Sequence, residues 1–202
     1  MKYRTLILLA SLAVSTARAD DWQPEAGFTS LFNGKDLTGW CFRAKTDKTA
    51  TQAGAITETF DGKTEAKDAG HYFAKDGVFT VSFPTEADKL TGQIYTVAEF
   101  PKNFVLKLQF RASVNADSGI FIRKPQLQCR DYLVAGPYKT LTKYKPQDWN
   151  QIEVTVKDGI AHCTCNGEVL EDALKLPATG PMGLEGDRGQ MEYRHIELKE
   201  TP

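Results

Sequence analysis

The sequence predicts an all-β domain, either a sandwich or a barrel. Apolar and polar residues alternate with a period of two in several segments, most clearly at 104–111 and 149–156. Asp-Gly and Asn-Gly pairs separate such segments, and these pairs are typical of tight hairpin turns because both central residues need positive φ. Helical periodicity is weak throughout. We therefore expect many short strands joined by glycine-containing turns.

The first expected hairpin turns at Lys75-Asp76-Gly77, between strand residues 72–73 and 78–83. Residues 104–111 follow as a half-buried strand, in which Phe104, Leu106 and Leu108 alternate with polar residues. These segments place strands in the first half of the chain.

The second half of the chain continues as a meander. The strand at 149–156 leads through Asp158-Gly159 into 160–165, and Asn166-Gly167 then turns the chain toward 168–170. The last expected strand runs over 191–198, with Met191, Tyr193 and His195 on one face.

Three segments do not follow this pattern. Residues 86–90 and 171–176 are the best candidates for short helical turns. Residues 44–69 are rich in Thr, Ala, Lys and Asp, and we expect a long irregular surface loop there, either as filler or as a wall of a binding groove.

The N-terminus is typical of a secretory signal peptide. Lys2 and Arg4 precede an apolar run at 6–14, and Ala17-Arg18-Ala19 is a small-x-small cleavage site. We expect residues 1–19 to be removed and residues 20–202 to form one exported domain, periplasmic or secreted. The apolar run is shorter than the roughly 20 residues of a membrane-spanning helix, so we expect no transmembrane segment.

The charge balance argues against nucleic acid as a partner. Cleavage after Ala19 removes three of the 25 basic residues and leaves 22 against 26 acidic ones, a net charge of −4. Nucleic-acid binders usually carry a strongly basic face. The sequence leaves the oligomeric state open.

Four cysteines remain after this cleavage, namely Cys41, Cys129, Cys163 and Cys165. An even number in an exported chain permits disulfides, with three possible pairings. The cysteines could equally act as small core hydrophobes. Cys163 and Cys165 would share one face of a strand at the outer distance limit for a bridge, and a zinc site there is the least favoured interpretation.

Polar side chains recur in a segment that otherwise looks like a core strand. Gln126, Gln128 and Arg130 alternate with Leu127 and Cys129, so amide and guanidinium groups would share one face. Such a face lies either in water or in a groove built for a polar ligand. Sugars are ligands that need amide, guanidinium and carboxylate partners at once. We therefore expect a small-molecule or oligosaccharide ligand.

Five motifs in the same order resemble those of the 3-keto-disaccharide hydrolase family. The resemblance covers nearly all of the expected mature chain, from about residue 27 to 199. The motifs are Leu-Phe-Asn-Gly-Lys-Asp-Leu-Thr-Gly-Trp at 31–40, Ala-Asp-Ser-Gly-Ile-Phe-Ile-Arg at 116–123, Trp-Asn at 149–150, Asn-Gly at 166–167, and the closing pattern at 183–196.

The resemblance implies a single concanavalin A-like jelly-roll β-sandwich with a ligand groove on its concave sheet. It also implies cleavage of glycosides whose sugar carries a ketone at C3. A base would remove the C2 proton, an enolate would form, the group on C1 would leave, and water would add back. This chemistry needs a base, donors for the enolate oxygen and an acid for the leaving group.

The sequence departs from the family pattern at several positions. Gln126 replaces a usual Glu, Arg188 replaces a usual His, and Asp117 and His195 replace Asn. A neutral amide cannot exchange a proton near neutral pH, and an Arg stays charged. These replacements favour either altered chemistry or a protein that only binds sugar.

Asp131 matches a family position, and we expect it to act as the general base; the alternative is a turn Asp that caps a loop. Arg123 and Arg188 would stabilise the enolate, although Arg123 could also be a strand-end Arg paired with a carboxylate. This hypothesis requires Arg123, Gln128 and Asp131 to converge in one hollow. The residues expected to hold the sugar are Asp117, Gln126, Gln128, Arg130, Glu185 and Asp187.

Two other functions remain open from the sequence. One is a non-catalytic lectin-like module, and the other is a glycosidase that uses Asp131 with Glu185 or Asp187. Trp40 and Trp149 could stack on a sugar, although a lone Trp is more often core. The three histidines lack zinc spacing and no cofactor is evident, while a divalent metal held by loop carbonyls stays possible.

Overall fold

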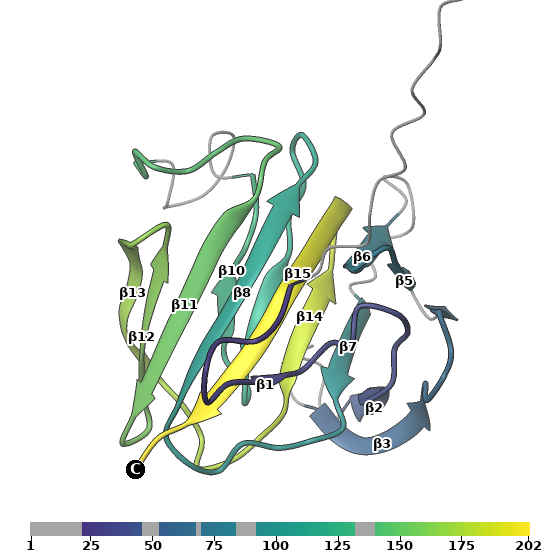
Figure 1. Cartoon of the computed structure of the whole chain (residues 1–202), viewed down its shortest axis with the longest axis horizontal. Coiled ribbons are helices and arrows are strands. Elements are labelled where there is room, and N and C mark those ends of the chain that lie inside the picture. Colours follow the sequence, from purple (N-terminus) through teal and green to yellow (C-terminus); the bar gives the residue numbers. More distant parts are fainter. Residues whose placement is uncertain (1–21, 46–52, 68–69, 84–91, 132–139) are drawn as a thin grey trace, which may run out of the picture.

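The structure is a computed structural model that describes residues 22–45, 53–67, 70–83, 92–131 and 140–202. Within these ranges the chain forms fifteen strands and no helix (Figure 1). The expected signal peptide at 1–19 and the expected helical turn at 86–90 lie outside the described residues. No helix in the described ranges could span a membrane.

The larger sheet has nine strands and is antiparallel throughout. In spatial order its strands are β13 (Glu168–Lys175), β12 (Ile160–Cys165), β11 (Asn150–Lys157), β8 (Phe104–Ala112), β15 (Gly189–Glu200), β6 (Val78–Phe83), β5 (His71–Lys75) and β4 (Glu65–Lys67), and β1 (Thr29–Ser30) also pairs with β15. The strands and turns expected at 72–83 and 149–170 are confirmed.

The smaller sheet has six antiparallel strands, and its neighbours come from distant parts of the sequence. The two sheets pack face to face as a concanavalin A-like jelly-roll sandwich, so the expected fold class is confirmed (Figure 1). In spatial order its strands are β10 (Gln126–Gln128), β9 (Gly119–Ile122), β14 (Met182–Gly186), β7 (Gly92–Thr96), β2 (Trp40–Lys45) and β3 (Ala53–Thr59).

The core lies between the sheets and follows the alternation of the sequence. In β8 every second residue is buried, and Leu106, Leu108 and Phe110 face the smaller sheet. Trp40 is fully buried and meets the ring of Phe79 edge-on at 4.8 Å, so Trp40 is a core residue and is not available to a sugar. Each such side chain contributes roughly 1.5–3 kcal/mol of burial free energy.

All four cysteines are free and buried. Cys163 and Cys165 share the core face of β12 with Ala161, as expected from the alternation. Cys41 lies instead on the outer face of the smaller sheet, beside Tyr95 and Phe121. The interpretation of the cysteines as small hydrophobes is confirmed, and none of the three disulfide pairings is present.

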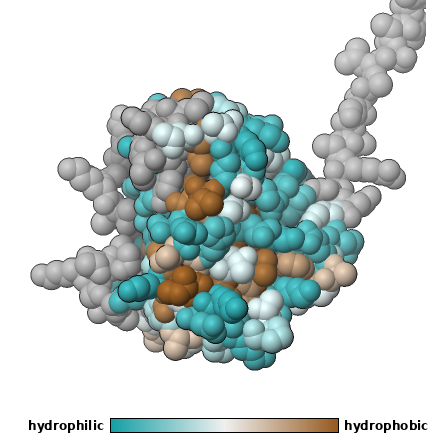
Figure 2. Space-filling view, turned by 90° about the vertical axis from the view of Figure 1, so that its left-hand side faces the viewer, coloured by the Kyte–Doolittle hydropathy of each residue, from teal (hydrophilic) through white to brown (hydrophobic). Residues whose placement is uncertain are grey.

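The expected helical turn at 171–176 is wrong, because residues 168–175 form the edge strand β13. Its residues pair with β12 through register shifts at Cys163, so the edge is irregular. Glu171, Asp172 and Lys175 place charge along it, which opposes pairing with another chain. The face of the molecule seen from this side is mainly hydrophilic, with small hydrophobic spots (Figure 2).

The irregular loop expected at 44–69 is also corrected. Within its described part, β3 and β4 form strands at the far ends of the two sheets, and residues 46–52 and 68–69 are not described. Thr favours an extended strand, and the alternation there is weak because β3 is mostly exposed and β4 buries only Ala66.

A β-bulge corrects the expected position of His195. Arg194 pairs with Gln109 and Glu197 with Lys107, so β15 has one residue more than β8 over this stretch. His195 takes a φ of 52°, in the left-handed region, and is only partly buried. The bulge breaks the alternation, so Met191 and Tyr193 face the core and His195 does not.

Candidate functional site

One outer sheet face collects most of the polar residues that the sequence analysis selected. On β10, Gln126 and Gln128 point away from the core while Leu127 is buried in it. Neighbouring strands and loops add carboxylates and guanidinium groups. We call this set the polar cluster, and it consists of Asp117, Gln126, Gln128, Arg130, Glu185, Asp187 and Arg188.

A chain of hydrogen bonds runs through the cluster in one direction. Arg130 donates to the side-chain Oε1 of Gln128, and Gln128 Nε2 donates to Gln126 Oε1 at 2.9 Å. Gln126 Nε2 then donates to Glu185 Oε2. Because a guanidinium can only donate and a carboxylate only accepts, both amide orientations between them are fixed. The chain therefore delivers a donor to one oxygen of Glu185.

Asp117 ties the cluster to the loop after β14. Its carboxylate lies 3.0 Å from Arg130 Nε and 3.7 Å from an Arg188 nitrogen. The backbones of Asp117 and Arg188 also exchange hydrogen bonds at 2.9 and 3.1 Å. Both guanidinium groups are thus oriented around one carboxylate at the cluster's edge.

Two glycines let long side chains lie flat on this sheet. A Cβ at Gly119 would stand 2.2 Å from Gln126 Nε2, and a Cβ at Gly183 would stand 2.6 Å from the Tyr95 ring. Gln126 therefore crosses β9 over Gly119 to reach Glu185 on β14. Any larger residue at 119 would push the amide off the carboxylate.

Glu185 is the most perturbed carboxyl group of the cluster. Burial away from water is the main cause and raises its pKa to about 7, and the negative charge of Asp187 adds to the increase. The hydrogen bond from Gln126 and the charge of Arg130 act in the opposite direction. Glu185 can therefore exchange a proton near neutral pH, whereas Gln126 cannot.

Asp187 stands at the exposed rim of the cluster. Partial burial raises its pKa and the Asp117 carboxylate raises it further, while Arg188 and Arg130 lower it. Glu185 and Asp187 thus form an acidic pair beside two guanidinium groups. The site joins a proton carrier, fixed positive charge and amide groups on one surface.

The sequence analysis missed two residues beside Glu185. Gln93 on β7 pairs in register with Glu185, and its Nε2 is buried without a hydrogen-bond partner among the described residues. Tyr95 donates its hydroxyl hydrogen to Gln93 Oε1, and burial raises its pKa strongly. The signal was available in Gly-Gln-Ile-Tyr-Thr at 92–96, which alternates polar and apolar residues as β10 does.

Asp131 does not join the polar cluster. It is 2% exposed, and its carboxylate accepts hydrogen bonds from the Asn115 backbone at 3.1 Å, from Gln147 Nε2 at 3.2 Å and from the Tyr144 hydroxyl at 3.3 Å. The alternation of β10 continues past the strand end, so Asp131 points inward with Leu127 and Cys129. These contacts agree with the alternative given in the sequence analysis, in which Asp131 is a turn residue that caps a loop.

Arg123 also lies apart from the cluster. It is 7% exposed, has a φ of 61° at the end of β9, and donates to the carbonyl oxygens of Pro177 and Lys102 at 2.8 and 2.6 Å. Its guanidinium lies 5.5 Å from the Phe104 ring centre, and burial lowers its pKa. The expected convergence of Arg123, Gln128 and Asp131 is therefore wrong.

Trp149 lies near the opposite sheet and is flanked by two guanidinium groups. The Arg194 and Arg111 carbons lie 4.1 and 4.8 Å from its ring centre. These cation–π contacts occupy the ring, which a sugar would otherwise use for stacking. In the described ranges, no group of three or more His, Cys, Asp or Glu side chains is arranged to hold a metal ion.

Fold and site together define a carbohydrate-related jelly-roll protein. The chain belongs to the family of 3-keto-alpha-glucoside-1,2-lyase-like domains, whose profile matches residues 27–199. The resemblance noted in the sequence is thereby confirmed. No curated protein matches the chain.

Solved structures support the same fold. A protein described as a "putative glycosyl hydrolase" from Parabacteroides distasonis ATCC 8503 is similar over 87% of this chain and 95% of its own, with 18% identity and a TM-score of 0.60. A second solved chain comes from work on endo-acting O-glycanases of the human gut microbiota. It is similar over 86% of this chain and 100% of its own, with 8% identity and a TM-score of 0.51.

Proposed function

We propose that this protein cleaves 3-keto-glycosides on the outer face of the six-stranded sheet. The family description names a 1,2-lyase acting on a 3-keto-alpha-glucoside, a reaction that breaks the C2–H and C1–O bonds. A base takes the C2 proton, and the electron pair of that bond forms the enolate of the C3 ketone. The enolate then expels the C1 oxygen, which leaves with a proton as an alcohol.

Glu185 is the base in this proposal, in place of Asp131. The supporting observation is the hydrogen-bond chain that ends on Glu185 Oε2, together with a pKa of about 7. Because Gln126 holds Oε2, the other oxygen, Oε1, is the atom that receives the proton. A base with a pKa near the working pH combines ionisation with sufficient strength to remove a proton next to a ketone.

The remaining members of the cluster bind and orient the sugar. Arg130 and Arg188 supply positive charge near the developing enolate, the role that the sequence analysis expected of Arg188 although the family usually has His at that position. Gln93 Nε2 and the amides of Gln126 and Gln128 offer donors and acceptors to hydroxyl groups. Asp187, at the exposed rim of the cluster, is the proposed acid for the leaving oxygen, and partial burial together with the charge of Asp117 raises its pKa.

The test is incubation with a 3-keto-disaccharide and its unoxidised counterpart, each with and without chelator, followed by mass spectrometry. We expect the 3-keto sugar alone to yield a monosaccharide and an unsaturated or hydrated 3-keto product. Turnover of the unoxidised disaccharide would favour a two-carboxylate glycosidase. Binding of sugar by calorimetry without any product would favour the non-catalytic module, which the neutral Gln126 supports.

We also propose that the protein is exported after cleavage near Ala19. The support is the basic, apolar and small-residue order of residues 1–19. N-terminal sequencing of protein isolated from outside the cytoplasm of an expressing bacterium would begin at Asp20. A sequence beginning at Met1 would contradict export by cleavage.

A further inference from the structure

A hollow of about 390 Å³ lies on the outer face of the nine-stranded sheet. Trp22, Glu25, Gln109, Gln151, Glu153 and His195 line it. The strands β8, β11 and β15 form its floor, and the described start of the chain crosses in front of them (Figure 1). Its size falls in the range of small-molecule sites, roughly 300–1,000 Å³.

The N-terminal segment that walls this hollow is fixed to the sheet. The Glu25 backbone donates to Glu197 Oε2 at 2.8 Å, and Glu197 is only 3% exposed. Lys107 Nζ lies 2.6 Å from the Glu25 carboxylate. The fold therefore holds the N-terminal wall in place, and Lys107 already forms an ion pair with Glu25.

The β-bulge of β15 supplies an aromatic plate to the hollow. It turns His195 out of the ladder, and the ring stacks on Trp22 with centroids 4.7 Å apart and planes 7° from parallel. Trp22 stays partly exposed, and both Trp22 and His195 also line a second hollow of about 200 Å³. The stacked pair thus borders two hollows.

An amide ladder forms the floor. Gln109 and Gln151 are paired in register, and Gln109 Nε2 donates to Gln151 Oε1 at 3.4 Å. Arg194 Nε donates to Gln109 Oε1 at 2.8 Å, which fixes the orientation of the first amide. Glu153 adds a carboxylate that accepts hydrogen bonds. The hollow therefore joins an aromatic plate to oriented donors and acceptors.

We propose that this hollow is a second saccharide-binding site that takes a neutral sugar ring. Pyranose C–H groups suit the Trp22–His195 plate, and sugar hydroxyls suit the amides and Glu153. Anionic sugars are disfavoured because Lys107 is paired with Glu25 and the remaining charge is acidic. A metal cation fits less well, since the described residues hold no ligand group of three.

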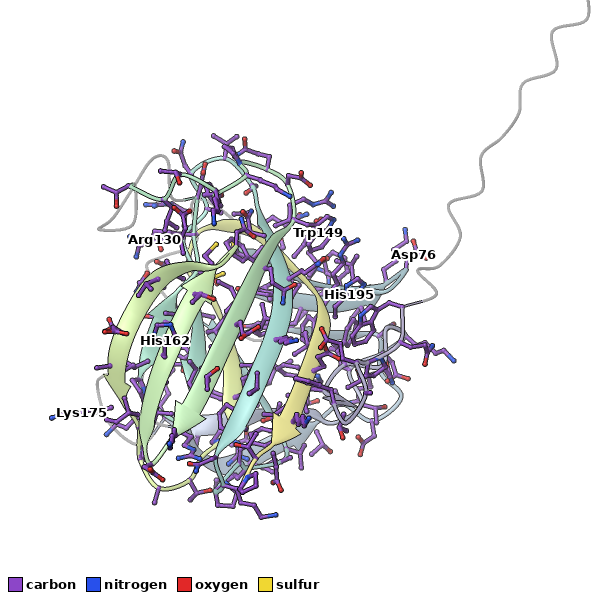
Figure 3. All side chains as sticks on the ribbon, turned by 60° about the vertical axis from the view of Figure 1, so that its left-hand side comes forward. Asp76, Arg130, Trp149, His162, Lys175 and His195 are labelled. Carbon is purple, nitrogen blue, oxygen red and sulfur yellow. The ribbon has the colours of Figure 1, made fainter. Side chains whose placement is uncertain are left out.

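The two sites face opposite ways. In Figure 3 Arg130, a member of the polar cluster, lies toward one side of the sandwich, and Trp149 and His195 lie toward the other. A glycan held at the second site would keep the protein on its polymer while the first site acts on a chain end. This site does not depend on the proposed reaction, because its binding is measured without turnover.

The experiment is a two-dimensional ¹H–¹⁵N NMR titration of the whole mature chain with maltose and with cellobiose. We expect the Trp22 indole N–H and the Gln109 and Gln151 side-chain amides to shift, while the core Trp40 indole stays unchanged. Trp22→Ala should weaken the affinity for the disaccharide about fivefold, whereas Trp22→Phe, which keeps a ring, should retain most of it. Glu185→Gln should leave these shifts unchanged.

Two results would overturn the proposal. One is a set of Trp22 and Gln151 signals that do not move at about 50 mM of either disaccharide, far above the millimolar dissociation constants of weak sites. The other is an unchanged affinity in Gln151→Ala, a substitution that leaves the N-terminal wall in place. Failure of the enzymatic test with 3-keto sugars would leave this result unaffected.

Discussion

Gln126 reaches across Gly119 and donates a hydrogen bond from Nε2 to Oε2 of Glu185, two strands away. The same amide accepts from Gln128, which accepts from Arg130, so a fixed positive charge is linked to a carboxyl group of raised pKa. The replacement of the family's Glu by Gln126 thus leaves one titrating carboxyl on this line instead of two. Four predictions follow from that arrangement, and a fifth concerns the separate, buried Asp131.

Glu185→Gln should lower kcat/KM for a 3-keto-glycoside by about 10²–10⁴-fold, the usual contribution of a positioned base. In the unmodified protein we expect kcat/KM to rise with pH through about 7, because the ionised carboxylate removes the proton. Steady-state kinetics between about pH 5 and about pH 9 measure both effects. A variant with undiminished activity would remove Glu185 from the chemistry.

Stability should fall as pH rises through the same window. The folded pKa of Glu185 is about 7, well above the ordinary value of a glutamate side chain, so the folded state binds the proton more tightly. Protonated Glu185 therefore adds on the order of 3 kcal/mol to the free energy of unfolding below the unfolded pKa, and this contribution is lost as the pH rises toward 7. Urea unfolding at several pH values should show this slope in the unmodified protein and a flatter one in Glu185→Gln.

Gly119→Ala should raise the pKa of Glu185 further. The added Cβ would meet Gln126 Nε2 at 2.2 Å and displace the amide whose hydrogen bond lowers that pKa. Gly183→Ala is the matched control, because its Cβ meets the Tyr95 ring and leaves Gln126 in place. Carboxyl ¹³C NMR titration reads the pKa directly. Equal shifts in both variants would contradict the positioning role of Gly119.

Gln126→Glu should create a carboxyl pair with Glu185. Two carboxylates in hydrogen-bond contact share one proton, so their macroscopic pKa values move apart, one downward and one upward. We expect two titration steps by ¹³C NMR where the unmodified protein shows one near 7. A single unchanged step would mean that residues 126 and 185 do not meet in solution.

Asp131→Ala should reduce stability and leave the chemistry intact. The substitution removes the acceptor for the Tyr144 hydroxyl, Gln147 Nε2 and the Asn115 backbone, at a cost of about 3 kcal/mol. Chemical denaturation measures the loss, and kcat per folded molecule should stay within about twofold of the unmodified value. Loss of turnover in fully folded Asp131→Ala or Asp131→Asn would restore Asp131 as the base.

Local patterns in the sequence determined most of the sandwich. The turns at Asp76-Gly77 and Asn166-Gly167, and the alternation along β8, follow from positive-φ preference and period-two burial. Two expectations were wrong where those signals are weak. The helical turn expected at 171–176 is edge strand β13, which buries few of its residues. His195 does not face the core, because the bulge adds one residue that breaks the alternation.

The sequence by itself also determined which face of β10 carries Gln126, Gln128 and Arg130, since strict alternation fixes a side chain's direction. Only the tertiary structure decided what lies beside them. Glu185 is 59 residues from Gln126, and it becomes a neighbour because β14 inserts between β9 and β7. The same alternation turns Asp131 inward, and only the tertiary structure brings Tyr144 and Gln147, from the loop before β11, into hydrogen-bond contact with it.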